Sequence, residues 1–215
     1  MPAASVRTDA DVVPSDWGLD AEGRPWLLFD GVRFELPLRG EHQAANAMLA
    51  VAVARACGVP LGDAAAGMAA MPVPSMRGVW QTLGKAVLIN DAYNANPPSM
   101  RAAIDLLGRV GQGRQRVAVL GTMRELGAAS AAQHLEVAKA ALASPADLIA
   151  VTGEFAPSFA ALAPQDGRVV RAEQFDDLWP LLEPRLSPDA VILLKASRGM
   201  RLERLVPFLT AWATA

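Results

Sequence analysis

From residue 86 onward, short apolar runs alternate with longer segments of helical periodicity. The runs are apolar on both faces, as in strands of a parallel sheet that helices cover on either side. We expect strands at residues 86–89, 116–120, 147–151 and 190–194, and helices at residues 100–110, 131–143, 175–183 and 202–212. The pattern predicts an α/β fold with a mostly parallel sheet, in which ligands bind at the carboxyl ends of the strands.

The first part of the chain has a different pattern. Two apolar runs, residues 26–29 and 32–36, flank Asp30-Gly31. An Asp-Gly pair between such runs predicts a β-hairpin, because both turn residues tolerate positive φ. After the hairpin we expect helices at residues 41–56 and 62–71, and prolines at 72 and 74 end the second helix. The segment before Trp26, which precedes the hairpin, is polar and is expected to be irregular. We place a domain boundary near Gly78.

Composition narrows the class of protein. Of the 215 residues, 52% are hydrophobic and 20% charged, which favours a packed core over disorder. The net charge of -2 argues against a general nucleic-acid binder. The single cysteine, Cys57, excludes an internal disulfide and is compatible with a reducing cytoplasm. We find no signal peptide and no apolar run long enough for membrane insertion, so we expect a cytoplasmic protein.

Polar residues follow the strand expected at 86–89. Asp91 could accept hydrogen bonds from the hydroxyls of a sugar, and Asn94 and Asn96 offer amide donors and acceptors close by. Asn, Pro and Ser are also turn and cap residues, and Ser99 could simply cap the next helix. A binding role and a purely structural role both remain open for this segment.

Two further polar segments follow strands. Residues 121–127 form a Gly-bounded loop that could present backbone N–H groups to an anion, although an ordinary turn between strand and helix has the same pattern. Lys195, Ser197 and Arg198 could bind a carboxylate or phosphate. Surface charge is the alternative there, but cations are disfavoured at a helix start unless an anion lies nearby, which favours a binding role.

A fourth group is divided along the chain. His42 and Asn46 lie one turn apart at the start of a helix, and Arg77 follows the proline-rich turn. A histidine in that position is more often a cap or packing residue than a catalyst. The two histidines, His42 and His134, are far apart and no cysteine pair exists, so we expect no zinc site. Residues 78–85 only approximate a phosphate-binding P-loop, with one spacer too many, and we expect no P-loop in this chain.

Taken in order, these segments resemble the Mur ligases, the ATP-dependent amide ligases of peptidoglycan synthesis. Residues 91–100 are similar to a D-S-Y-N-A-N-P-x-S-M motif of the branch that adds D-alanyl-D-alanine. Residues 121–127, 195–203 and 38–46 resemble that branch's L-G-D-M-x-E-L-G, K-G-S-R-G-M-x-M-E and L-P-G-x-H-N-x-x-N stretches. The resemblance implies a Rossmann-like C-terminal domain at residues 79–215. It also implies that residues 1–78 are the hairpin-and-helix tail of a central ATPase domain.

The resemblance also implies an activity and its participants. ATP would phosphorylate the carboxylate of a UDP-N-acetylmuramoyl-tripeptide, and the amine of D-Ala-D-Ala would then attack the acyl-phosphate. The P-loop and the ligands of the Mg²⁺ ion would lie upstream, in an N-terminal ATPase half that this chain lacks. No metal site is implied within these residues.

The resemblance also implies roles for individual residues of this chain. The nucleotide would be bound by His42, Asn46, Arg77 and Asp91, with Asn46 near the adenine, Arg77 at the phosphates and Asp91 at the ribose. Lys195 and Arg198 would face the acyl-phosphate. The residues implied in substrate binding are Tyr93, Asn94, Asn96, Thr122, Glu125 and Ser197.

Four residues depart from the family motifs. Gln43 stands in place of an Asn that helps to hold the adenine, and Met76 in place of a Gly before Arg77. Thr122 replaces an Asp that could bind the incoming ammonium. Ala196 replaces a Gly, where the backbone could need positive φ.

The family resemblance and the four departing residues leave three interpretations of the function. The chain is interpreted first as the C-terminal portion of such a ligase, inactive alone. It could instead be a half-enzyme that works with a separately encoded P-loop partner. The third interpretation, which the four departures favour, is a non-catalytic binding or regulatory module. For the first 78 residues we also expect exposed apolar surface around Trp26, Leu28 and the alanine-rich helix.

Overall fold

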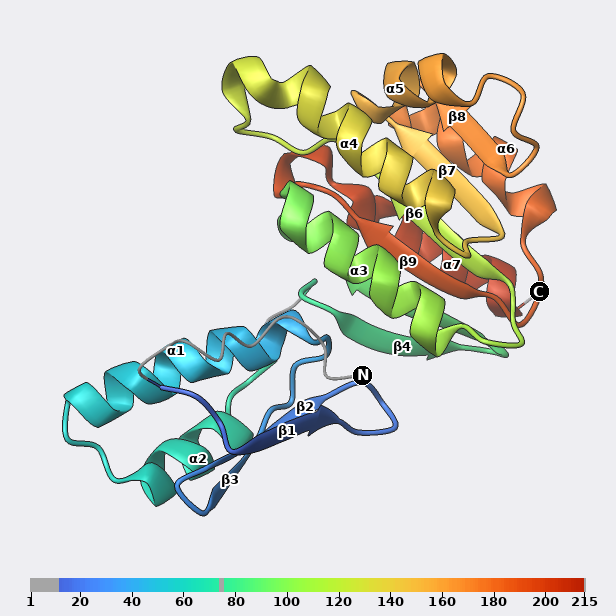
Figure 1. Ribbon diagram of the computed structural model, residues 1–215. Helices are drawn as coiled ribbons and strands as arrows, with labels where there is room; N and C mark the ends of the chain where they lie inside the picture. Colours follow the sequence, from blue (N-terminus) through green and yellow to red (C-terminus); the bar gives the residue numbers. More distant parts are fainter. Residues whose placement is uncertain (1–11, 74–75, 215) are drawn as a thin grey trace. The chain divides into compact units, whose positions relative to one another are not determined.

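The computed structural model describes residues 12–73 and 76–214, and it divides the chain into two compact units. The first unit covers residues 1–73 and the second residues 74–215 (Figure 1). Each unit has its own sheet. Residues 1–11 and Pro74, which belong to the expected N-terminal domain, lie outside the described residues.

The first unit is a three-stranded antiparallel sheet with two helices. Its strands β1 (Asp16–Leu19), β2 (Pro25–Phe29) and β3 (Val32–Glu35) lie in that order, followed by α1 (His42–Ala56) and α2 (Leu61–Ala69). The expected hairpin is confirmed, with positive φ at Asp30 and Gly31. The expectation of an irregular segment before Trp26 was wrong, because Asp16–Leu19 pairs with β2. Asp16 and Gly18 are residue types that are rare in strands, so this segment lacks the alternation of polar and apolar residues that would have indicated one.

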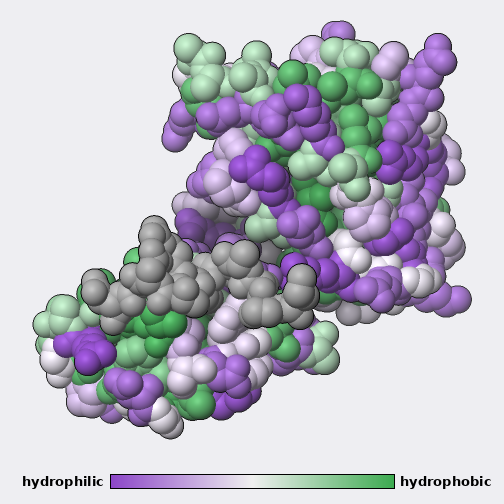
Figure 2. All heavy atoms as spheres, in the orientation of Figure 1, coloured by the Kyte–Doolittle hydropathy of each residue, from purple (hydrophilic) through white to green (hydrophobic). Residues whose placement is uncertain are grey.

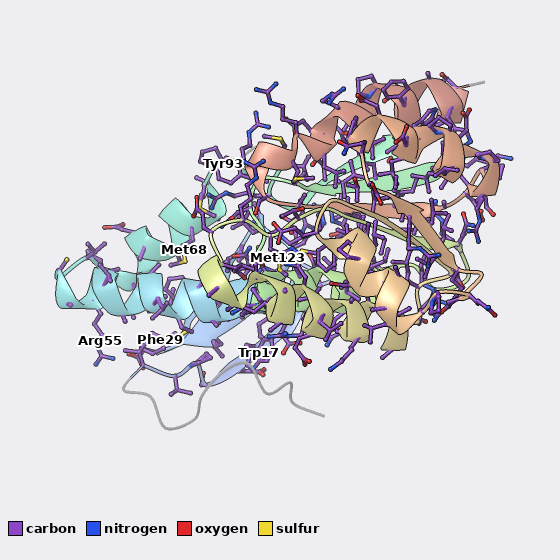
Figure 3. The ribbon with its side chains drawn as sticks, turned by 90° about the horizontal axis from the view of Figure 1, so that it is seen from above. Trp17, Phe29, Arg55, Met68, Tyr93 and Met123 are labelled. Atoms are coloured by element: carbon purple, nitrogen blue, oxygen red, sulfur yellow. The ribbon has the colours of Figure 1, made fainter. Side chains whose placement is uncertain are left out.

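The helices of the first unit cover one face of this small sheet. Leu27, Phe29 and Phe34 from the strands pack against Met48 and Val51 of α1, all of them buried. Trp17, Phe29 and Met68, labelled in Figure 3, come from β1, β2 and α2 and belong to the same cluster.

The outer face of α1 carries apolar side chains at the surface. Leu49 is 70% exposed and Val53 is 63% exposed, whereas Trp26 and Leu28 are half-buried. Figure 2 shows hydrophobic residues at the surface of this unit. The apolar surface expected here is therefore present on the alanine-rich helix, but much less so at Trp26 and Leu28.

The second unit contains a six-stranded sheet in the order β4-β5-β9-β6-β7-β8. All neighbouring strands are parallel except β4, which pairs antiparallel with β5 at one edge. The predicted fold class is confirmed. The strands are β4 (Val79–Leu83), β5 (Ala86–Asp91), β6 (Arg116–Leu120), β7 (Leu148–Thr152), β8 (Val169–Ala172) and β9 (Val191–Lys195).

Helices cover both faces of this sheet (Figure 1). On one face lie α3 (Pro97–Val110), α4 (Ser130–Ala143) and α5 (Phe155–Leu162). On the other lie α6 (Leu178–Leu182) and α7 (Leu205–Thr214). Short 3₁₀ turns occur at residues 127–129, 175–177, 183–185, 198–200 and 202–204. Each face of the sheet is thus covered by its own apolar cluster, which is why most residues of its central strands are apolar.

Several expected elements differ from the structure. The helix expected at 175–183 is only five residues of α helix between two 3₁₀ turns, because Pro180 fits its first turn and Pro184 ends it. Strands β4 and β8 and helix α5 were not predicted. Gly84 and Lys85, part of the approximate P-loop pattern, form the two-residue turn between β4 and β5. Within the described residues no helix is long and apolar enough to cross a bilayer.

One ion pair fastens the start of β6 to the segment before β7. The Asp147 carboxylate accepts hydrogen bonds from the backbone N–H of Arg116 at 2.8 Å and from its guanidinium at 3.0 and 3.2 Å. The hydrogen bonds from Arg116 lower the pKa of Asp147 below its ordinary value. The pair therefore stabilises the fold only while the carboxylate is ionised.

We predict a pH-dependent effect of Asp147→Asn. A lowered folded-state pKa means that the stabilisation is present above about pH 4 and is lost as the pH falls through the folded pKa. The variant should be less stable than the wild type at pH 7, by under about 1 kcal/mol because the pair is partly exposed. Urea unfolding at several pH values tests this, since the difference should shrink as the pH falls below about 4. Asp105→Asn, on the exposed face of α3, is the control and should show no such trend.

Candidate functional site

The candidate site residues of the second unit gather at one edge of its sheet. In a parallel sheet the carboxyl ends of neighbouring strands meet at the same edge. Asp91 ends β5 and is paired in register with Lys195, which ends β9. Leu120, the last residue of β6, is paired with Lys195 on one side and with Val151 of β7 on the other. The segments that follow β5, β9 and β6 therefore lie next to one another, as predicted from the sequence.

Lys195 is the buried charge of this edge. Its side chain is 3% exposed, and its ammonium lies 2.8 Å from Oδ2 of Asp91. It also donates a hydrogen bond to the backbone oxygen of Asn94 at 2.7 Å and a long one to that of Asp91 at 3.5 Å. An unpaired buried ammonium would be costly, so Asp91 and the Asn94 carbonyl must stay close to it. Lys195 thus fixes the shape of the segment that follows β5.

Asp91 is held from two sides. Besides the ion pair with Lys195, its Oδ1 accepts a hydrogen bond from the backbone N–H of Gly78 at 3.0 Å. The side chain keeps 24% of its surface exposed, so the carboxylate is fixed in place but still reachable by a ligand.

The two asparagines have local structural roles. Oδ1 of Asn94 accepts a hydrogen bond from the N–H of Ala95 at 2.8 Å. Asn96 caps α3: its Oδ1 accepts from the N–H of Ser99, whose Oγ accepts from the N–H of Asn96. A cap does form in this segment, with Asn96 as the cap residue and Ser99 as its reciprocal partner. Both asparagines are exposed at the surface, so a substrate could also reach them.

Thr122 joins three loops. Its side chain is buried, and Oγ1 accepts a hydrogen bond from the N–H of Glu154 after β7 at 2.9 Å. Its carbonyl oxygen accepts from the N–H of Ser197 after β9 at 3.1 Å. Oγ of Ser197, also buried, accepts in turn from the N–H of Arg124 at 2.8 Å. Thr122 and Ser197 therefore brace the loops, and neither hydroxyl is freely exposed.

His134 holds the loop that follows β6 in place. Met123, labelled in Figure 3, donates its backbone N–H to Nε2 of this buried histidine at 2.9 Å. Because Nε2 accepts, the proton is on Nδ1, which lies 2.8 Å from the backbone oxygen of Ser130 and donates to it. The sequence analysis considered His134 only as a metal ligand and missed this role. The feature that could have indicated this role is the position of His134 in the first turn of the helix expected at 131–143, which follows the loop at residues 121–127.

The remaining candidates are exposed. Arg198 forms an ion pair with Glu203. The Arg77 guanidinium lies over the ring of Tyr93, 4.4 Å from its centroid. Glu125 adopts a left-handed conformation with φ 66°. Arg198, Arg77 and Glu125 are thus charged groups that a ligand at this unit's surface could reach.

His42 and Asn46 belong to the first unit. Gln43 lies between them: its Nε2 is 3.1 Å from Nε2 of His42, and its Oε1 accepts a hydrogen bond from Nδ2 of Asn46 at 3.0 Å. The residue that departs from the family motif therefore links the two candidate nucleotide-binding side chains into one group.

The backbone conformation is informative at two of the four residues that depart from the family motifs. Ala196 is not among the residues with positive φ, so the expectation that this position could need a glycine for its backbone was wrong. Met76, in contrast, has φ 60°, a conformation that favours glycine. Within residues 12–73 and 76–214, no group of three or more His, Cys, Asp or Glu side chains gathers as a metal site would require.

A cavity of about 840 Å³ opens at the ends of β7 and β8. It adjoins Thr122 and the Gly199-Met200 turn, and the sequence analysis missed it because α5 and β8 were not recognised. The feature of the sequence that could have indicated this cavity is the Thr-Gly pair directly after the expected strand at 147–151. The lining residues are Thr122, Thr152, Gly153, Glu154, Ala156, Pro157, Ala160, Arg171, Glu173, Gln174, Phe175, Gly199 and Met200.

We predict that Gly121 and Ala196 are energetically coupled. A Cβ added at Gly121 would lie 2.9 Å from the Cβ of Ala196, closer than packed carbons allow. Gly121→Ala should therefore destabilise the fold by roughly 1–3 kcal/mol in urea unfolding. Adding Ala196→Gly should recover much of that loss, which a double-mutant cycle measures. Gly167→Ala is the control, since a Cβ there meets nothing within 4 Å, and simple additivity at positions 121 and 196 would refute the coupling.

We also predict that Met76→Gly stabilises the chain. A non-glycine residue in the left-handed region costs about 1 kcal/mol, and glycine removes that cost. The matched variant Met76→Ala truncates the side chain but keeps the Cβ, so it should give no such gain. Thermal unfolding compares the two, and equal melting temperatures would contradict the strain argument.

Comparisons with known proteins agree with this geometry. The model of the family "Mur ligase, glutamate ligase domain" matches residues 78–198. A UDP-N-acetylmuramoyl-tripeptide–D-alanyl-D-alanine ligase of Bacillus subtilis is 34% identical over 177 residues, which cover 80% of this chain and 39% of that protein. The protein of the same name in Mycobacterium tuberculosis H37Rv is 33% identical over 241 residues, covering 97% of this chain and 47% of that protein.

Solved structures agree as well. A crystal structure of MurF from Acinetobacter baumannii matches with a TM-score of 0.82 at 29% identity, covering 94% of this chain and 45% of that one. The chain thus spans less than half the length of the relatives described here. The match of the family model to more than half of the residues shows that the chain belongs to the Mur ligase family.

Proposed function

We propose that this chain is the C-terminal portion of an ATP-dependent ligase that joins D-alanyl-D-alanine to a UDP-N-acetylmuramoyl-tripeptide. The observation that carries the proposal is the convergence of three motif segments around the buried Lys195–Asp91 pair. The names of the B. subtilis and M. tuberculosis relatives support this choice of substrate. Residues 1–78 would then belong to the end of a central ATPase domain, and residues 79–215 to the C-terminal domain.

Within this proposal the two cations have different tasks. All three N–H groups of the Lys195 ammonium point to partners, so its task is to position Asp91 and the Asn94 segment. Arg198 is exposed, and its partner Glu203 is a carboxylate whose side chain is 25% exposed; the guanidinium would exchange this partner for an acyl-phosphate. Asn94, Asn96, Glu125 and Tyr93 would complete the substrate contacts.

The nucleotide-binding residues fit ATP in part. The fixed, partly exposed carboxylate of Asp91 suits the hydroxyls of a ribose, and the Arg77 guanidinium suits phosphate. His42 and Asn46 would face the adenine. When bound, ATP supplies the phosphoryl group that activates the tripeptide carboxylate. We place the P-loop and the Mg²⁺ ligands in the half of the enzyme upstream of this chain.

A chimera tests the proposal. The C-terminal part of the B. subtilis ligase is replaced by this chain, and product formation from ATP, UDP-N-acetylmuramoyl-tripeptide and D-Ala-D-Ala is measured by mass spectrometry. We expect ligation that depends on D-Ala-D-Ala. Lys195→Met should lower its rate by about 100-fold or more, because Asp91 and Asn94 lose their anchor. Lys139→Met removes an exposed lysine of α4 and should leave the rate unchanged.

The alternatives give other outcomes. Ligation by a simple mixture of this chain with the separate upstream half would indicate a half-enzyme that works with a partner. A folded chimera that binds the UDP-linked substrate but forms no product would contradict the proposal and favour a non-catalytic module. Circular dichroism of each variant shows whether the fold is retained.

A further inference from the structure

A closed cycle of hydrogen bonds links the loop after β6 to the loop after β7. The N–H of Met123 donates to Nε2 of His134 at 2.9 Å, and Nδ1 of His134 donates to the carbonyl oxygen of Ser130 at 2.8 Å. Oγ of Ser130 donates to Oε2 of Glu154 at 2.6 Å, and the N–H of Glu154 donates to Oγ1 of Thr122 at 2.9 Å. Thr122 directly precedes Met123 in the chain, so the cycle closes.

Every donor of this cycle faces an acceptor only while the imidazole is neutral. His134 is fully buried and meets the ring of Phe155 edge-on, with the two centroids 4.7 Å apart. Because Nδ1 already carries a proton, a second proton has to go to Nε2, where it points at the N–H of Met123. Two N–H groups cannot bond to each other, so protonation breaks the cycle at Met123.

Glu154 is placed to stabilise the charge that protonation creates. Its Oε2 lies 3.8 Å from Nδ1 of His134, and in the part of the chain that the structure describes no other carboxylate oxygen lies within 4 Å of either ring nitrogen. A carboxylate next to an imidazolium favours the charged form. The neutral and the charged imidazole thus each have a partner, Met123 for the first and Glu154 for the second.

The other charged groups around α4 are at the surface. The exposed charged side chains of α3 and α4 are Arg101, Asp105, Arg109, Glu136 and Lys139. Helix α5 carries no charged residue. What these helices bury against one another is apolar, including Ile104, Val137 and Phe159. Glu154 is therefore the charged group that the imidazole meets.

The loop that this cycle holds is strained. Glu125 has φ 66°, a left-handed conformation that residues other than glycine keep only when surrounding contacts fix it. On its other side the loop is fixed through the N–H of Arg124, which donates to Oγ of Ser197 at 2.8 Å. Once the contact from Met123 is lost, the strain at Glu125 favours a second loop conformation.

We infer that neutral His134 is a positioning residue for the loop at residues 121–127, and that its protonation releases this loop while Glu154 pairs with the imidazolium. Histidine is the side chain that ordinarily changes its charge between about pH 5 and pH 8. The conformation of the loop therefore depends on pH across that range. The consequence for catalysis, a loss of ligation on the acid side, rests on the proposed function.

Two substitutions separate the tasks of the two ring nitrogens. His134→Gln places an amide oxygen near the position of Nε2, where it can accept the N–H of Met123 and cannot be protonated. His134→Asn places its amide near the position of Nδ1, so it keeps a donor for Ser130 but offers Met123 no acceptor. The first variant should keep the loop fixed at every pH, and the second should release it at every pH.

Nuclear magnetic resonance of the whole chain between about pH 8 and pH 5 tests this inference. In the wild type the amide shifts of residues 122–127 should move together with the imidazole resonances of His134, and in His134→Gln they should stay still. Amide exchange at Met123 near neutral pH should be about tenfold faster in His134→Asn than in the wild type. Glu154→Gln should move the wild-type transition to lower pH, because the imidazolium loses its partner.

His42→Gln is the matched control, because it makes the same substitution at the chain's other histidine, in the first unit. It should leave the transition of the loop unchanged. Loop shifts that follow pH equally in the wild type and in His134→Gln would overturn the inference. So would a wild-type loop that stays still while the imidazole titrates, a result that needs no variant to fold.

The chimera separates this inference from the proposed function. Its kcat should fall on the acid side with His134 in place, and this fall should be weaker in His134→Gln. An acid limb that is identical in both refutes the positioning role in catalysis and leaves the ligase standing. A chimera without product, combined with a loop that titrates with His134, refutes only the ligase.

Discussion

The arrangement of the second unit's polar edge depends on one buried charge. Lys195 ends β9, which lies between β5 and β6, so its ammonium has little access to water. Removing an ammonium from water costs several kcal/mol, and only nearby negative groups can offset that cost. Asp91 and the carbonyl oxygen of Asn94 do so, and both belong to the segment after β5. The conformation of that segment therefore depends on one lysine that follows Asp91 by 104 residues in the sequence.

The loops on the other side of β9 are tied by close backbone contacts. Gly121 allows the side chain of Ala196 to approach, and Gly153 allows Thr122 to accept the N–H of Glu154. Neither contact leaves room for a Cβ. The replacement of an aspartate by Thr122 is compatible with this packing, because a hydroxyl needs far less solvation than a carboxylate when buried. The charge is absent at position 122, and a carboxylate is present one strand further along.

The sequence predicts the central parts of the fold and the place of the site, but not its internal contacts. Strands β6 and β9 contain four consecutive apolar residues each and were recognised almost to the residue. β4 and β8 were not, because β4 carries polar residues at its exposed edge and β8 has only four residues. The candidate residues follow strands, so their common edge could be predicted. The pairing of Lys195 with Asp91 could not, because it depends on the strand order, and the missed strand β8 concealed Arg171 and the cavity.

The strand order also sets a sequence of chemical groups along the sheet edge. Asp91 and the Arg77–Tyr93 pair lie at the end of β5, Lys195 and Ser197 follow β9, Thr122 follows β6, and Glu154 follows β7. In the proposed ligase the nucleotide would lie at the end of β5, and the activated carboxylate would lie beside the turn after β9. Neighbouring parallel strands lie about 4.8 Å apart, so the groups are spaced by roughly the size of the substrate parts they would bind. In the proposed ligase, a rigid sheet with its strands in this order would hold the reacting groups side by side without any of the loops having to be long.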